Sequence, residues 1–152
     1  MKKAFLLALL TVISASISAF ALPAGDVKWY NLKDGTAKAK TEKKPMIVDF
    51  FYSKECPRCA KLEQDIYKNP DIARKINADF IPIFIDLTKR LSRDEEALGN
   101  TYDYKNDCLM LFLDSDMSII KDPSGKKMCF VDNIEAGAFN SYLDMIRGQM
   151  KK

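Results

Sequence analysis

The 152-residue sequence contains no histidine, and this absence excludes several kinds of chemistry at once. Without imidazole there is no Ser-His-Asp triad, no Cys-His dyad, and no zinc or copper site built on histidine ligands. The glycine patterns that cradle phosphates or dinucleotides are also missing. Any chemistry that the protein performs must therefore come from cysteine, carboxylates, lysine, tyrosine or the backbone.

No apolar stretch has the length and uniformity of a convincing transmembrane helix, but the first residues form a recognisable signal. A short basic start precedes an apolar stretch over residues 4–13, and a small-x-small pattern follows at 19–21. We expect residues 1–21 to be a signal peptide cleaved after Ala21; cleavage after Ala24 and retention as an uncleaved anchor are the alternatives. Cleavage lowers the formal charge from +3 to +1, and nothing then points to nucleic acid or an anionic membrane surface as a partner.

Residues 22–152 are expected to form one α/β domain without repeats. Nearly continuous apolar runs predict buried strands, and polar capping residues followed by apolar positions at helical spacing predict helices between them. The expected strands cover 46–52, 80–85 and 109–113, with a hairpin return over 117–120. Pro82 either moves the start of the second strand later or places that strand at a sheet edge. Expected helix caps are Asp34, Asn69 and a capping box from Ser92 to Glu95, and the last helix carries an apolar stripe from Phe139 to Ile146. This order predicts a central mixed β-sheet with helices on both faces.

Four cysteines, Cys56, Cys59, Cys108 and Cys129, all lie in the expected mature chain. An even number of cysteines in an exported protein indicates disulfides first. The class of the protein therefore depends on which cysteines pair and on whether the pairs are static.

One motif carries chemistry, namely Cys56-Pro57-Arg58-Cys59, which follows a buried strand and opens a helix. Unpaired N–H groups and the positive end of the helix dipole stabilise a thiolate at that position. Cys56 at the helix start is the expected nucleophile, and Cys59, one turn further on, is the expected resolving thiol that attacks a mixed disulfide. A permanent structural disulfide between the two is the alternative.

The segments around this motif resemble the thioredoxin superfamily, in particular the exported group that includes the C-terminal domain of the membrane disulfide reductase DsbD. The resemblance rests on residues 44–52, the Cys-Pro-Arg-Cys motif, and the segments 69–71, 80–86 and 111–114. It implies a thioredoxin-like fold and a periplasmic thiol–disulfide oxidoreductase that acts on protein thiols and disulfides in the reducing or disulfide-transfer direction. A membrane-embedded electron donor, a monomeric state and no cofactor or resident metal are further expectations from it.

Two departures from the superfamily pattern concern the site. Members often carry a buried acid beneath the motif that assists proton transfer from the resolving cysteine, and Asp49 is the candidate. It lies one residue further from Cys56 than the usual spacing, so a differently placed polar group of the strand is the alternative. Glu55 precedes Cys56 where many relatives have an aromatic residue, which implies a more polar docking surface.

The third departure is Cys108, which the resemblance places at the position of the family's cis-proline. A cis bond before a residue other than proline costs roughly 2.5–4 kcal/mol, so we expect a trans peptide there. The resemblance also implies that Cys129 lies on the neighbouring strand. Three interpretations of this pair stay open. The first is a Cys108–Cys129 disulfide that is structural or relays electrons. The second is a four-thiolate metal or iron–sulfur module made with Cys56 and Cys59, and the third is two free, buried thiols that only pack.

Overall fold

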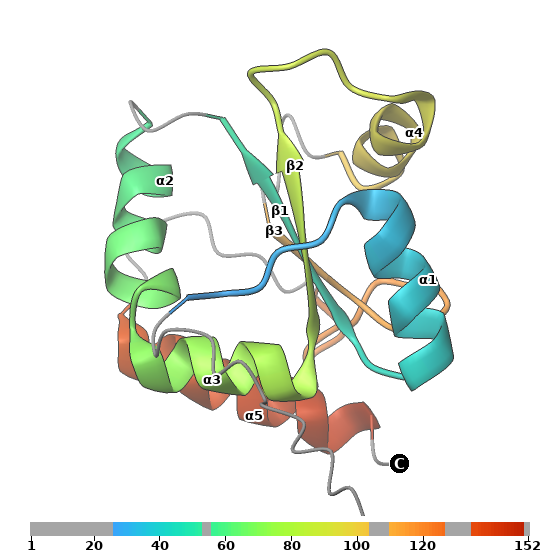
Figure 1. The fold of residues 1–152 in the computed structure, drawn as a ribbon. Coiled ribbons are helices and arrows are strands. Elements are labelled where there is room, and N and C mark those ends of the chain that lie inside the picture. Colours follow the sequence, from blue (N-terminus) through green and yellow to red (C-terminus); the bar gives the residue numbers. More distant parts are fainter. Residues whose placement is uncertain (1–25, 53–55, 104–109, 127–134, 151–152) are drawn as a thin grey trace, which may run out of the picture.

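The computed structural model describes residues 26–52, 56–103, 110–126 and 135–150 (Figure 1). In chain order the elements are α1 (Leu32–Glu42), β1 (Met46–Phe51), α2 (Pro57–Leu62), the π-helical turn η1 (Glu63–Tyr67), α3 (Pro70–Asp79), β2 (Ile81–Asp86), α4 (Arg93–Thr101), β3 (Met110–Leu113) and α5 (Ala136–Met150). Among these described helices, none is long and apolar enough to cross a membrane.

The three strands form a mixed sheet in the order β2-β1-β3. β1 is parallel to β2 and antiparallel to β3, and helices cover both faces of the sheet (Figure 1). α1 and α4 lie on one face, and α2, η1, α3 and α5 lie on the other. The predicted α/β architecture is therefore confirmed.

Alternation along β1 assigns its side chains to two separate cores. Ile47 points to the core beneath α2, η1, α3 and α5, whereas Val48 points to the core beneath α1 and α4. Because successive residues of a strand face opposite sides, Asp49 shares the face of Ile47. Its partner in the register, Met110, belongs to the same core.

Pro82 lies within β2 at the edge of the three-stranded sheet, one residue after the strand begins. Its carbonyl accepts from the Tyr30 N–H at 2.9 Å, and the Phe84 N–H donates to the Tyr30 carbonyl at 3.0 Å. Ile81 donates to the carbonyl of Pro45 on the β1 side, so the nitrogen of Pro82 faces away from β1 by alternation. The predicted position of this strand at the sheet edge agrees with the structure. The alternative, a strand that starts after Pro82, is not seen, because the missing N–H of Pro82 interrupts no bond to β1.

The predicted caps hold at two helices and shift at a third. Asn69 caps α3, and Ser92 and Glu95 form the capping box of α4. At α1 the cap is Asn31 rather than Asp34, whose N–H donates to Asn31 Oδ1 at 2.8 Å. The earlier start places Leu32 on the buried face of the helix, which explains the shift.

The predicted hairpin return after β3 is present as a single antiparallel bridge between Leu113 and Ile119, not as a strand over 117–120. Asp114 Oδ1 accepts from the N–H groups of Asp116 and Ser118, each at 2.9 Å. This tight turn leaves Met117 with φ of 71°, which interrupts an extended backbone.

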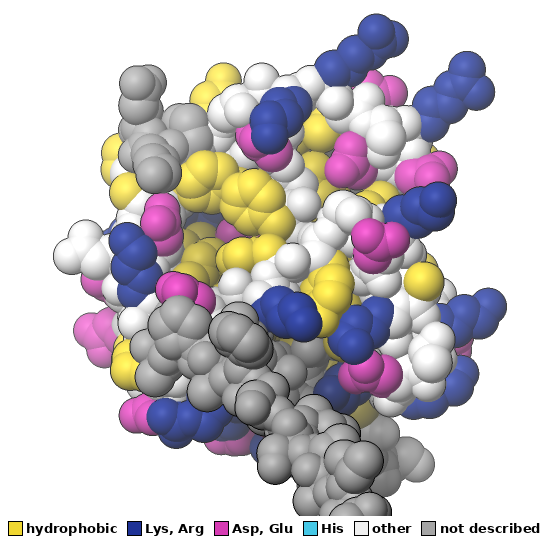
Figure 2. Space-filling model, viewed as in Figure 1, with side chains coloured by type: hydrophobic (Ala, Val, Ile, Leu, Met, Phe, Trp, Pro, Cys, Tyr) yellow, Lys and Arg dark blue, Asp and Glu magenta, His cyan; other side chains and the backbone are white. Residues whose placement is uncertain are grey.

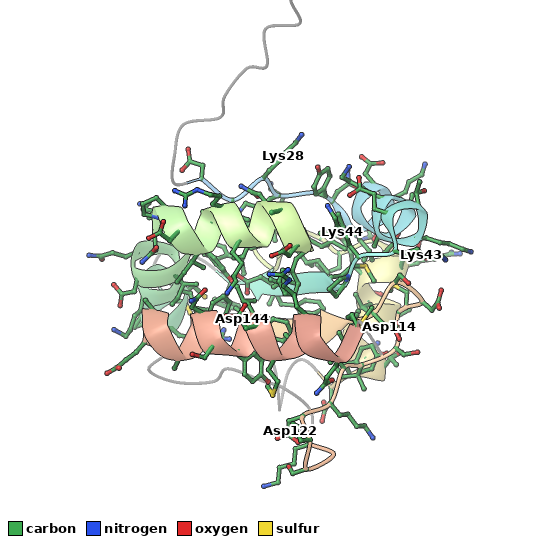
Figure 3. The ribbon with its side chains drawn as sticks, turned by 90° about the horizontal axis from the view of Figure 1, so that it is seen from below. Lys28, Lys43, Lys44, Asp114, Asp122 and Asp144 are labelled. Carbon is green, nitrogen blue, oxygen red and sulfur yellow. The ribbon has the colours of Figure 1, made fainter. Side chains whose placement is uncertain are left out.

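The helices α3 and α5 lie side by side across the lower face (Figure 3). Lys75 on α3 bridges them, because its Nζ lies 2.6 Å from a carboxylate oxygen of Asp144 and 2.8 Å from Asn140 Oδ1. The apolar stripe of α5 includes Phe139, Leu143 and Ile146, which are fully buried. Together with the Lys75 contact, this stripe closes the core between the sheet and the two helices.

Candidate active site

The Cys-Pro-Arg-Cys motif lies at the start of α2, with Cys56 as the N-cap residue. Cys56 has an extended backbone, and its Sγ accepts the backbone N–H of Cys59 at 3.2 Å. Pro57 occupies the first helical position, where its fixed φ fits and a missing N–H breaks no helical bond. The sulfur thus receives the kind of N–H contact that favours an anion at a helix start.

The two cysteines differ in exposure. Cys56 is partly exposed, whereas Cys59 is only 3% exposed. A substrate can therefore approach Cys56 while Cys59 stays covered. This asymmetry suits the roles of nucleophile and resolving thiol that the sequence predicts.

Asp49 on β1 is a buried acid, as the sequence predicts for the candidate proton-transfer residue. Its side chain is 2% exposed, and Asp49 Oδ2 accepts the hydroxyl of Tyr67 at 2.8 Å. Burial raises the pKa of Asp49 from 3.8 to about 6, while the Tyr67 hydrogen bond and the Arg58 charge act in the opposite direction. The carboxyl group can therefore exchange a proton close to neutral pH.

Sequence reasoning missed Tyr67, the partner of Asp49. Tyr67 ends η1 and is 7% exposed. Burial first, and then the Asp49 charge, raise the pKa of Tyr67 well above 10.0, and a smaller effect in the same direction comes from Cys59. Its hydroxyl therefore stays protonated and donates, and it lies within electrostatic reach of both the acid and the buried cysteine.

A π turn explains why the position of Tyr67 was hard to predict. In a regular α-helix a residue eight positions after Cys59 is rotated from it by about 80° around the axis. In η1 the Lys68 N–H instead donates to the Glu63 carbonyl at 3.0 Å, a bond that spans five residues. A π turn advances less per residue, so it rotates Tyr67 back toward the face that carries Cys59.

Arg58, the second residue between the cysteines, also belongs to the site. Its Nη1 atom is buried, and its charge lowers the pKa of both Asp49 and Tyr67. The guanidinium charge of Arg58 therefore acts on the acid and on its hydroxyl partner.

An aromatic pocket of about 490 Å³ adjoins Tyr67. Its lining residues are Asp26, Val27, Trp29, Phe51, Glu63, Tyr67, Lys68 and Phe84. Trp29 packs edge-on against Tyr67 with ring centroids 4.9 Å apart, and it also contacts Phe84. Figure 2 shows hydrophobic side chains around a hollow between α2 and the strands. The pocket therefore combines aromatic surface with the charged residues Asp26, Glu63 and Lys68.

Cys108 and Cys129 lie outside the described residues, as does Glu55. The Cys108–Cys129 pair, the trans peptide before Cys108 and the four-thiolate alternative therefore stay predictions. In the predicted set, Cys56 and Cys59 share a hydrogen bond, and Asp49 is connected to Cys59 through Tyr67, on which the charges of both act. The structure adds Tyr67 and Arg58 to this set.

Comparison with known proteins identifies the class. The model of a thioredoxin-like family matches residues 28–108, more than half of the chain, and the chain belongs to this family. Spermatogenesis-associated protein 20 of Mus musculus is 33% identical over 70 residues, which is 45% of this chain and 9% of that protein. The chain thus matches about a tenth of the length of this curated relative.

Solved structures show the same fold at low sequence identity. The oxidoreductase DsbH is 18% identical with a TM-score of 0.58, over 86% of this chain and 90% of that one. A thioredoxin from Thermus thermophilus is 16% identical with a TM-score of 0.59, over 80% and 87% of the two chains. The C-terminal domain of DsbD from Neisseria meningitidis is 18% identical with a TM-score of 0.54, over 74% and 91%. The thioredoxin-like fold and the likeness to the DsbD domain that the sequence predicted are confirmed.

Proposed function

We propose that the protein is a thiol–disulfide oxidoreductase that exchanges disulfides with protein substrates through Cys56 and Cys59. The observation that carries this proposal is the helix start itself. The sulfur of the partly exposed Cys56 accepts an N–H from the backbone of the buried Cys59, and family membership supports the same chemistry.

In the reducing direction, the Cys56 thiolate attacks one sulfur of a substrate disulfide. The substrate S–S bond breaks, a mixed disulfide with Cys56 forms, and the first substrate thiolate leaves. Cys59 then loses its proton and attacks the Cys56 sulfur, which forms the Cys56–Cys59 disulfide and releases the second substrate thiolate. The protein loses two electrons and the substrate gains them.

Asp49 is the proposed acceptor of the Cys59 proton. The S–H bond of Cys59 breaks and an O–H bond forms on the carboxylate, which later releases this proton to solvent. With a pKa of about 6, most Asp49 carboxyl groups are ionised at neutral pH and can accept. A proton that stayed on sulfur would instead block the attack, because the thiolate is the nucleophile.

We further propose that residues 1–21 direct export to the periplasm and that 22–152 is the mature domain. Protein disulfides are the proposed substrates, and a membrane-embedded electron donor keeps the protein reduced. The oxidoreductase DsbH and the C-terminal domain of DsbD share the fold of this chain, and this likeness supports protein thiols and disulfides as substrates. Fractionation of cells followed by mass measurement of the mature N-terminus tests the cleavage after Ala21.

Two cysteine variants test the chemistry with a fluorescent disulfide-bonded peptide. Cys56→Ser is expected to lower peptide reduction to the background rate, because it removes the attacking sulfur. Cys59→Ser is expected to accumulate a mixed disulfide on Cys56 that is visible by intact mass spectrometry, because nothing resolves it. Cys56→Ser protein that still reduces the peptide at the wild-type rate would refute the proposal.

The matched control is the double variant Cys108→Ser/Cys129→Ser. If this control reduces the peptide at the wild-type rate, the reaction uses only Cys56 and Cys59. If peptide reduction is lost, the result indicates that Cys108 and Cys129 relay electrons. A bound metal that protects all four cysteines of the wild-type protein from alkylation would contradict the oxidoreductase proposal and favour the four-thiolate binding module.

A further inference from the structure

We propose that Tyr67 is a positioning residue for the reaction, whose hydroxyl holds the Asp49 carboxylate in place to receive the proton of Cys59. This inference rests on the proposed function and deepens it. In this proposal Tyr67 acts through Asp49, to which it donates its hydroxyl.

The geometry fixes the phenol on the acid. Tyr67 Oη lies 2.8 Å from Asp49 Oδ2, and both side chains are more than nine-tenths buried. The edge-on contact with Trp29, at 4.9 Å between centroids, and the burial of the ring restrict its rotation. The hydroxyl therefore cannot exchange Asp49 for water without moving a packed ring.

The position of Tyr67 in the chain connects the acid to the thiols. α2 and η1 form one continuous helical segment, so the element that begins at Cys56 also ends at Tyr67. Cys59 lies close enough for its charge to act on Tyr67, whose hydroxyl reaches Asp49. The segment that carries the dithiol thus also carries the donor that orients the acid.

Charged and titratable groups of the described residues lie around the acid. From α2, Arg58 acts on Asp49 and Cys59 acts on Tyr67. From the neighbouring strands, Phe84 and Met110 pair with Asp49 in the register and carry no charge. The aromatic pocket adjoining Tyr67 adds the charged residues Asp26, Glu63 and Lys68.

Within this set, Tyr67 and Arg58 favour the ionised carboxylate, and burial opposes it. A hydrogen bond to a charged group contributes enough that its loss moves the titration midpoint by about one to two pH units. Without the Tyr67 hydroxyl, about half or more of the carboxyl groups would therefore be protonated at pH 7. A protonated Asp49 cannot accept a proton from Cys59, and resolution of the mixed disulfide would require higher pH.

The test compares Tyr67→Phe with Tyr102→Phe as the matched control. Tyr102 donates its hydroxyl to the Met117 carbonyl at 2.6 Å and packs against the core on the opposite face of the sheet, so its variant also loses one hydrogen bond. Carbon-13 NMR of the Asp49 carboxyl, assigned with Asp49→Asn, gives the titration midpoint. A preformed mixed disulfide of Cys56 with glutathione gives the rate of glutathione release against pH.

We expect both the NMR midpoint and the release profile of Tyr67→Phe to move up by about one to two pH units, with Tyr102→Phe unchanged. If wild-type protein releases glutathione but Tyr67→Phe shows unmoved curves, the inference is wrong while the proposed function stands. If wild-type protein releases no glutathione at any pH, the proposed function itself fails, and the inference falls with it.

A second variant keeps the test decisive if Tyr67→Phe does not fold. Site-specific replacement of Tyr67 by 3,5-difluorotyrosine retains the ring and makes its hydroxyl a stronger donor. The midpoint and the release profile should then both move to lower pH. Movement to higher pH, or none, would overturn the inference.

Discussion

Replacing Asp49 by asparagine should change the pH dependence of stability in a direction that the structure fixes. The side chain is 2% exposed, and burial is the largest cause of its raised pKa. Asparagine has nearly the same shape and keeps an oxygen that can accept from Tyr67, but it cannot ionise. The difference between the two proteins therefore isolates the cost of a buried carboxylate.

The magnitude follows from the pKa of about 6 in the folded protein against the ordinary 3.8. Because the folded state holds this proton more tightly than the unfolded state, raising the pH deprotonates the unfolded chain first and lowers the free energy of unfolding. The contribution is complete below about pH 3.8 and is lost as the pH rises through about 6. A difference of about two pH units corresponds to about 3 kcal/mol lost by about pH 7.

Urea unfolding of wild type and Asp49→Asn, both reduced, at several pH values from about 3 to about 7 measures this quantity. The stability of Asp49→Asn relative to wild type should rise by about 3 kcal/mol across that range. A constant offset between the proteins, caused by the new amide group, does not affect this slope. A relative stability that stays flat with pH would show that Asp49 titrates in the folded protein as it does in the unfolded chain.

Asp86→Asn is the control of opposite sign. Hydrogen bonds from Thr88 and Lys89 lower the pKa of Asp86 to about 2. The stability that this partly exposed acid contributes is present above its ordinary pKa and is lost as the pH falls through about 2. The asparagine variant should therefore be relatively least stable at neutral pH, whereas Asp49→Asn is relatively most stable there.

Two further predictions concern the framework of the site. Gly35→Ala should destabilise the protein by about 1–3 kcal/mol in thermal or urea unfolding, because a Cβ there would lie 2.5 Å from Ile83 Cγ1 in the buried core. Gly137→Ala, at an open position of α5, should cause no loss, and an equal loss in both would contradict the steric explanation. Asn69→Ala should cost about 1 kcal/mol in the same assay, because Asn69 Oδ1 accepts two N–H groups of the first turn of α3. Asn69→Asp should largely preserve stability, and a full loss there would argue against capping.

Short sequence patterns predict the helix start at Cys56 and the helix caps, because each of these features depends on neighbouring residues only. A proline after Cys56 and an apolar strand before it are sufficient to indicate a helix start with one exposed and one covered cysteine. The capping residues Asn69 and Ser92 were correct for the same reason, since a cap bonds within its own first turn. Asp34 was wrong as a cap because Asn31 offers the same chemistry three residues earlier and gains the burial of Leu32.

The parts that sequence reasoning did not reach depend on rotation and distance. The side of the sheet that Asp49 faces follows from the exact register of β1, and one residue of error would move it to the opposite core. A regular helix would rotate Tyr67 from Cys59 by about 80°, and the π turn reduces this rotation. Periodicity of 3.6 residues therefore assigns Leu62 and Ile66 to the core but gives no reason to connect Tyr67 with an acid on β1.

The placement of Asp49 constrains how the site can be built. A strand covered on both faces buries every side chain, so an acid there destabilises the fold whenever it is ionised. Both groups that favour its ionised form, Arg58 and Tyr67, come from the single helical segment that begins at Cys56. A displacement of the start of that segment would therefore change the proton affinity of Asp49 together with the geometry of the thiols. The acid and the dithiol are therefore parts of one unit. A substitution of Arg58 or Tyr67 should change both the pKa of Asp49 and the reactivity of the two cysteines.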